Sequence, residues 1–129
     1  MSLEFMGYRR ADGRVGTRNT VAVISTVVCG NEVAEDIAGR VEGAVAFTHH
    51  QGCGRTQPDI ERTNMVLANL GRNPNVAAVL LVSLGCESTE VEQVAEAIRE
   101  SGKRVEIVVI QEEGGAARTL AAGTLIVQD

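Results

Sequence analysis

Four short runs of apolar, largely β-branched residues alternate along the chain with segments of helical periodicity. The runs occupy residues 20–28, 43–48, 76–84 and 104–111. Continuous apolar runs of this length are typical of strands buried on both faces of a parallel sheet. Residues 31–41 place apolar side chains three and four positions apart, which is the spacing of one helical face. We expect further helices over 58–71, over 89–100 with a capping box formed by Thr89 and Glu92, and from about 116.

This repeated alternation of strand and helix predicts an α/β domain with three layers and a Rossmann-like arrangement. Right-handed crossovers would place helices on both faces of a sheet of about four parallel strands. We expect the strand order 2-1-3-4. Residues 20–129 are interpreted as a single α/β domain, and the basic, glycine-rich residues 7–19 as an N-terminal arm. Residues 1–6 look like an expression scar and are left out of the fold prediction.

The composition excludes several classes of function. Only 2% of the residues are aromatic, so we expect no surface for stacking nucleic-acid bases. Twelve basic against seventeen acidic residues give a net charge of −5, which disfavours binding to a phosphate backbone. No apolar run approaches the roughly 20 residues that cross a bilayer, and no signal peptide opens the chain. An odd count of three cysteines argues against a secreted disulfide scaffold, so we predict a cytoplasmic protein.

All three cysteines and both histidines fall in loops that follow the expected strands, together with several glycines and one acid. These residues are Cys29 after the first strand; His49, His50, Gly52, Cys53 and Gly54 after the second; Cys86 and Glu87 after the third; and Gly114 and Gly115 after the fourth. Ligands of open α/β sheets bind beyond the carboxyl ends of the strands. We therefore expect these residues to line one edge of the sheet.

Thiolate and imidazole side chains are suitable ligands for iron, zinc or an iron–sulfur cluster. The cysteine spacing is not that of a zinc ribbon. Three cysteines from three loops instead suggest iron, as Fe²⁺ or as a [4Fe–4S] cluster whose fourth iron is free to take a substrate hydroxyl. The simpler interpretations are that the cysteines are small buried apolar residues, the histidines exposed loop residues and the glycines turn formers. Glu87 would then be a first-turn charge. No glycine motif for a nucleotide is present, so no nucleotide cofactor is expected.

Four segments resemble, in order, the large-subunit region of the altronate/galactarate dehydratase family, which includes sulfolactate sulfo-lyase. They are GYRRADGRVGTRN, HHQGCG, PNVAAVLLVSLGCE and IQEEGG. The resemblance implies dehydration of a sugar acid with iron or another divalent metal. It also implies a small SAF-type domain or subunit and a larger body of several hundred residues. This chain would be the first α/β domain of that body, a piece of a larger enzyme that is inactive alone.

The resemblance carries individual residues over to this chain. Matching positions are Arg18 and Asn19 in the arm, Cys29, His49, Cys53, Cys86 and Glu87. Two positions depart from the family pattern, because Val28 stands where Asn is common and Ala116 where Thr is common. These departures leave the substrate open among altronate, galactarate and a sulfonated hydroxy acid.

Dehydration requires a base for the proton next to the carboxylate, and an acid or metal for the leaving hydroxyl. We expect His49 to act as acid or base, with His50 in reserve, and Glu87 to orient a ligand or metal-bound water. Arg18 is expected to clamp a substrate carboxylate. Substrate contacts are also expected at Asn19, Gly52, Gly54, Gly114 and Gly115, and metal ligands at Cys29, Cys53 and Cys86. The alternative is a non-catalytic α/β module that binds small acids or assembles subunits, with a homo-oligomer possible in either case.

Overall fold

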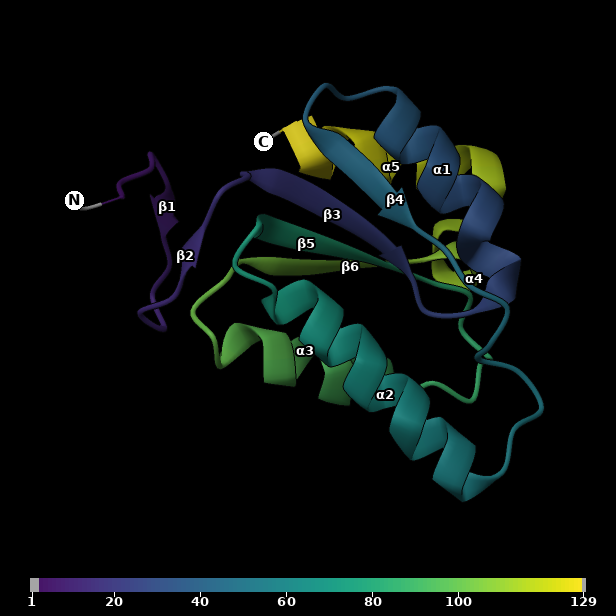
Figure 1. The fold of residues 1–129 in the computed structure, drawn as a ribbon. Helices are drawn as coiled ribbons and strands as arrows, with labels where there is room; N and C mark the ends of the chain where they lie inside the picture. The colour runs from purple at the N-terminus through teal and green to yellow at the C-terminus, as the bar shows by residue number, and fades with distance from the viewer. Residues whose placement is uncertain (1–2, 129) are drawn as a thin grey trace.

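Four parallel strands form a central sheet with helices on both faces, as Figure 1 shows. The structure is a computed structural model and describes residues 3–128. The sheet strands are β3 (Thr20–Ser25), β4 (Ala44–Phe47), β5 (Val76–Ser83) and β6 (Val105–Val109). The helices are α1 (Asn31–Gly39), α2 (Gln57–Arg72), α3 (Val91–Arg99), α4 (Ile110–Glu113) and α5 (Ala116–Gln128), and a 3₁₀ turn, η1, spans Val28–Gly30. The predicted α/β class is confirmed.

The strand order is β4-β3-β5-β6, with every neighbouring pair parallel. Counted along the chain from β3, this is the expected order 2-1-3-4. β3 is central, so Ile24 pairs with Phe47 on one side and with Leu81 on the other. The loops after β3, β4, β5 and β6 consequently leave the same edge of the sheet.

All four strands are shorter than the apolar runs that predicted them, and the difference is largest for β3 and β6. β3 ends at Ser25, and the fully buried Val27 already belongs to the turn before η1. β6 ends at Val109, and the buried Ile110 begins α4. In both cases the side chain is buried while the backbone has left the strand.

The core is divided by the sheet into two aliphatic layers. Successive strand residues point to opposite faces, so Ile24 and Leu81 pack toward α2 and α3, whereas Val23, Leu80 and Val82 pack toward α1 and α5. These five side chains are at most 1% exposed. Full burial of such a side chain is worth about 1.5–3 kcal/mol, so the core of this sheet is mainly aliphatic, and Phe47 packs against it as a partly buried aromatic residue.

The amino ends of the strands are covered by residues that the sequence marked as an arm. β1 (Tyr8–Arg9) and β2 (Val15–Gly16) form a short antiparallel pair that lies beside the start of β3 in Figure 1. The Arg10 guanidinium donates to Pro74 O (2.6 Å), and Thr17 N–H donates to the Asn75 side chain (2.8 Å). The arm is therefore docked on the turn that precedes β5. Residues 1 and 2 of the expected scar lie outside the described residues.

Lys103, the one lysine of the chain, lies buried beside the arm. Its Nζ donates to Gly71 O (3.0 Å) and to Asn73 O at the carboxyl end of α2. Burial lowers the pKa of Lys103 to about 8, and the positive charges of Arg10 and Arg14 add to the effect. Within residues 3–128, no helix is long and apolar enough to span a membrane.

Candidate functional site

The loops at the carboxyl edge of the sheet are joined to one another by backbone hydrogen bonds. The bonds run from Val28 N to Gln51 O (3.0 Å), from Ser88 N to Gly52 O (2.7 Å) and from Gln111 N to Leu84 O (3.0 Å). Each bond connects loops that follow different strands. The edge is therefore a continuous surface that involves all four loops, as the sequence pattern predicted.

Glu87 is the central acceptor of this edge. Its carboxylate accepts hydrogen bonds from the hydroxyls of Thr26 (3.1 Å) and Ser83 (2.8 Å) and from the backbone N–H groups of Leu84 (2.7 Å) and Gly85 (3.2 Å). Thr26 and Ser83 are buried. The carboxylate thus fixes the loop that follows β5 and links it to the residue that follows β3. In this arrangement both of its oxygens accept hydrogen bonds from protein donors.

Both ring nitrogens of His49 are engaged by the backbone. Gln51 N–H donates to Nδ1 (3.0 Å), and Nε2 lies 2.8 Å from Ser25 O. Because a carbonyl oxygen can only accept, Nε2 carries the ring proton and Nδ1 carries none. Asn31 holds the same segment by donating to His49 O (2.7 Å). His49 is therefore a positioned imidazole of defined tautomer.

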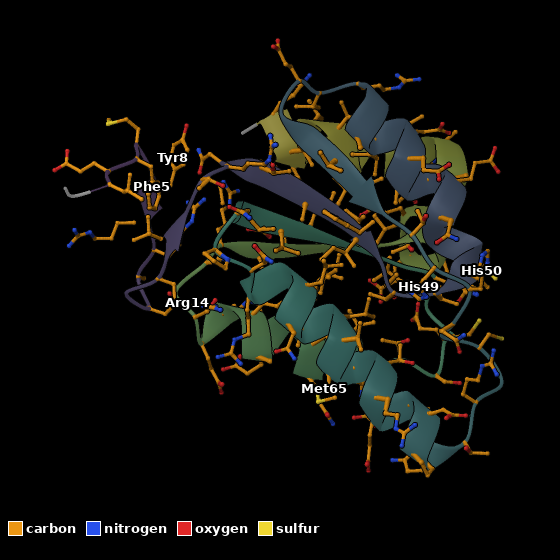
Figure 2. The ribbon with its side chains drawn as sticks, viewed as in Figure 1. Phe5, Tyr8, Arg14, His49, His50 and Met65 are labelled. Atoms are coloured by element: carbon orange, nitrogen blue, oxygen red, sulfur yellow. The ribbon has the colours of Figure 1, made fainter. Side chains whose placement is uncertain are left out.

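His50 is exposed, in contrast to its half-buried neighbour His49. Figure 2 shows both histidines at the end of the sheet opposite to the arm that carries Tyr8 and Arg14. The prediction of His49 as the principal histidine stays a prediction, and its fixed geometry favours it over His50.

The four glycines predicted to contact substrate all have positive φ, but their surroundings differ. Gly52 has φ +100°, and a Cβ at this position would lie 2.6 Å from Thr26 O, so the close approach of two loops requires glycine. Gly54 has φ +66° but faces open space. Gly114 and Gly115 have φ +91° and +122° and form the turn between α4 and α5. Their predicted contacts with substrate are untested.

The three cysteines are free and exposed. Cys86 Sγ accepts a hydrogen bond from Gln111 Nε2 (3.5 Å), and Cys29 lines a hollow between α1 and α5. No group of three His, Cys, Asp or Glu side chains among residues 3–128 is close enough to hold a metal ion. The cysteines share an edge, but they do not form a common ligand set, so the residues present do not fit a preformed iron site.

Arg18 and Asn19 lie at the opposite edge of the sheet from His49. They precede β3, and Arg10 donates to Asn19 Oδ1 (2.9 Å) and to Arg18 O (2.9 Å). β3 has six residues, which corresponds to about 20 Å of extended chain. The structure therefore does not bring these two predicted substrate residues together with the histidine and cysteine loops of the same chain.

Sequence reasoning missed the buried hydroxyls of the edge and the pocket beside it. Thr89, predicted as a helix cap, instead donates to Thr26 O (2.6 Å), and Glu90 occupies the cap position of α3. A pocket of about 530 Å³ opens between His49 and α2, and Arg55 and Arg62 are among its lining residues. The signal that could have found it is the helical spacing of positions 59, 62, 63, 66 and 70, which share one face.

Comparisons with known proteins decide the family. The family described as D-galactarate dehydratase/Altronate hydrolase, second domain, matches residues 7–129. The chain belongs to this family. It is 34% identical to the altronate dehydratase of Escherichia coli (strain K12) over 117 residues, and 33% identical to that of Bacillus subtilis (strain 168) over 118 residues. These alignments cover 82% and 83% of this chain and 24% of each relative.

A third relative has a different printed activity. The chain is 38% identical over 110 residues to the (2R)-sulfolactate sulfo-lyase subunit beta of Chromohalobacter salexigens, covering 85% of this chain and 28% of that protein. The chain thus spans about a quarter of the length of these relatives, and no solved structure matches it. The resemblance found in the sequence is confirmed.

Proposed function

We propose that this chain is the α/β domain of a metal-dependent sugar-acid dehydratase, a hydro-lyase that acts on altronate, galactarate or a related hydroxy acid. The observation that carries the proposal is the family match over residues 7–129, together with two relatives named altronate dehydratase. The third relative keeps a sulfonated hydroxy acid within the proposed substrate range. The remaining domains of the enzyme, an SAF-type domain or subunit and a homo-oligomer are proposed partners, and a cytoplasmic location stays a prediction.

The proposed reaction is a β-elimination. A base removes the proton next to the carboxylate, a leaving group departs from the neighbouring carbon, and the resulting enol becomes a 2-keto acid. The leaving group is the hydroxyl, released as water, for altronate or galactarate, and sulfite for a sulfonated acid such as sulfolactate. His49 is the proposed acid or base of this chain. With the proton on Nε2 and the Nδ1 lone pair accepting from Gln51 N–H, the neutral ring can take up a substrate proton only at Nδ1. To act as the base, Nδ1 must therefore exchange its contact with Gln51 N–H for one with the substrate.

Glu87 has a narrower proposed role than the sequence suggested. Four protein donors use its carboxylate, so we assign it to holding Cys86 and the start of the β5–α3 loop in place. Iron, as Fe²⁺ or an iron–sulfur cluster on Cys29, Cys53 and Cys86, is retained as a proposal for the assembled enzyme. No step is assigned to it, because residues 3–128 do not gather a ligand set.

A chimera tests the proposed function. Residues 7–129 would replace the aligned segment of Escherichia coli altronate dehydratase, and the protein would be purified anaerobically with iron. We expect production of a 2-keto acid from altronate, galactarate or sulfolactate, and its loss in His49→Gln but not in His50→Gln. Iron analysis of the chimera and of its Cys53→Ser variant tests the metal proposal. A folded chimera that turns over none of the three acids contradicts the proposed function.

A further inference from the structure

The pocket beside His49 has the size and position of a small-molecule site. Its volume is about 530 Å³, within the usual range of about 300–1,000 Å³ for ligand pockets. The end of β4 and the following loop form one wall, and α2 forms the other. The lining includes His49 and Gln51 at the carboxyl edge of the sheet, where open α/β proteins bind their ligands, and continues along α2 to Leu70.

The charged lining of this pocket is positive in a chain whose net charge is −5. Arg55 and Arg62 line it, with Asp59 as the one acidic residue among the lining side chains. In the part of the chain that the structure describes, neither guanidinium has an ion-pair or hydrogen-bond partner. Guanidinium groups bind carboxylates through paired hydrogen bonds, so these two arginines are available to an anionic ligand.

The rest of the lining suits a short hydroxylated carbon chain. Phe47, Leu67 and Leu70 provide apolar surface, against which the C–H faces of such a chain can pack. Thr48 and Thr63 add hydroxyl groups that can donate to or accept from a polyol. The combination of an apolar wall, hydroxyls and a positive end matches a hydroxy acid better than an uncharged polyol or a purely aliphatic ligand.

We propose that this pocket binds a small hydroxy acid, with Arg55 and Arg62 recognising its carboxylate. The inference rests on the proposed function and assigns the carboxylate contact to different residues than the sequence did. Arg18, the residue expected from the sequence, precedes β3 at the other edge of the sheet, about 20 Å of extended strand from the Ser25 carbonyl that contacts His49. Arg55 and Arg62 share a pocket with His49, so acid recognition and proton transfer meet at one place.

Binding to the 129-residue chain provides the first test. Galactarate and the neutral polyol galactitol would be titrated separately, by calorimetry and by NMR of the backbone amides. We expect saturable binding of galactarate, no binding of galactitol, and amide shifts in β4 and the first turns of α2. Arg55→Gln and Arg62→Gln should each weaken galactarate binding roughly tenfold. This is the lower end of the effect expected when a hydrogen bond to a charged group is lost. Arg40→Gln, at an exposed arginine outside the pocket, is the matched control and should leave affinity unchanged.

Asp59→Asn should change the affinity for galactarate in the opposite direction, and damage to the fold would not produce such an increase. Removing the acid from the pocket should tighten galactarate binding severalfold. The proposal is overturned if galactarate does not bind, or if Arg55→Gln and Arg62→Gln bind it as tightly as the parent chain. It is also overturned if the chimera is active and its Arg55→Gln and Arg62→Gln variants keep the KM of the parent chimera. In that case the proposed function stands. An inactive chimera with arginine-dependent galactarate binding overturns the proposed function and supports the pocket.

Discussion

Substitution of Glu87 by Ala tests whether this carboxylate holds the carboxyl edge together. Four donors lose their acceptor, but their situations differ. Gly85 N–H is exposed and can bond to water, and Thr26 Oγ1 keeps Val82 O at 3.2 Å. Ser83 Oγ is buried and has no other partner among the hydrogen bonds of the described chain. Stranding one buried donor costs about 1–3 kcal/mol, and the lost charge-assisted bonds add to this, so we expect a loss of about 2–4 kcal/mol in unfolding free energy.

Urea unfolding followed by far-UV circular dichroism measures this loss, since the chain has no tryptophan and one tyrosine. Glu96→Ala, at an exposed glutamate of α3, is the matched control and should change stability by less than about 0.5 kcal/mol. Adding Ser83→Ala to Glu87→Ala should recover about 1 kcal/mol, because the double variant no longer contains the stranded Ser83 hydroxyl. If Glu87→Ala is as stable as the control, the assignment of Glu87 to the loop is refuted and its carboxylate is free for a ligand.

Two further perturbations follow from local geometry. Gly52→Ala should lower the unfolding free energy by about 2–4 kcal/mol, because the added Cβ is both strained at positive φ and overpacked against Thr26 O. Gly54→Ala has the same strain at positive φ, but its Cβ meets open space, so it should lose less. Equal losses of the two variants in urea unfolding would contradict the close approach of the loops at Gly52. For Lys103, the folded-state pKa of about 8 lies below the ordinary value of 10.5, so the unfolded chain binds more protons between these pH values. The unfolding free energy of the parent should therefore rise relative to Lys103→Met from pH 8 to 10.5, and parallel stability curves would show that burial does not depress this pKa.

The sheet was predictable because its strands are continuous apolar runs separated by helical periodicity. Strand ends were less predictable, because apolarity reports burial rather than backbone conformation. Val27 and Ile110 are both buried, yet one lies in a turn and the other in a helix. Thr89 shows the same limit for polar residues, since its hydroxyl bonds to Thr26 O across 63 positions of sequence instead of capping α3.

The candidate site was predictable as an edge, but not as a set of contacts. Parallel topology alone brings His49, Cys86 and Glu87 to one side, whereas their partners depend on side-chain directions that a linear pattern does not contain. Arg18 illustrates the difference: it adjoins a strand of the site in sequence, but it adjoins the wrong end of that strand in space. Arg55 and Arg62 were overlooked because an arginine in a loop, like Arg55, or on the polar face of an amphipathic helix, like Arg62, is usually solvated surface.

The central position of β3 also affects the order in which this chain can fold during synthesis. β3 pairs with β4 within one local β–α–β unit, but its other edge pairs with β5, whose last residue Ser83 follows Ser25 by 58 positions. At about 5–20 residues per second, a ribosome takes roughly 3–12 s to add those residues. During that interval the nascent chain exposes an unpaired apolar strand edge, so this is the period in which the protein is most open to chaperone binding and to aggregation.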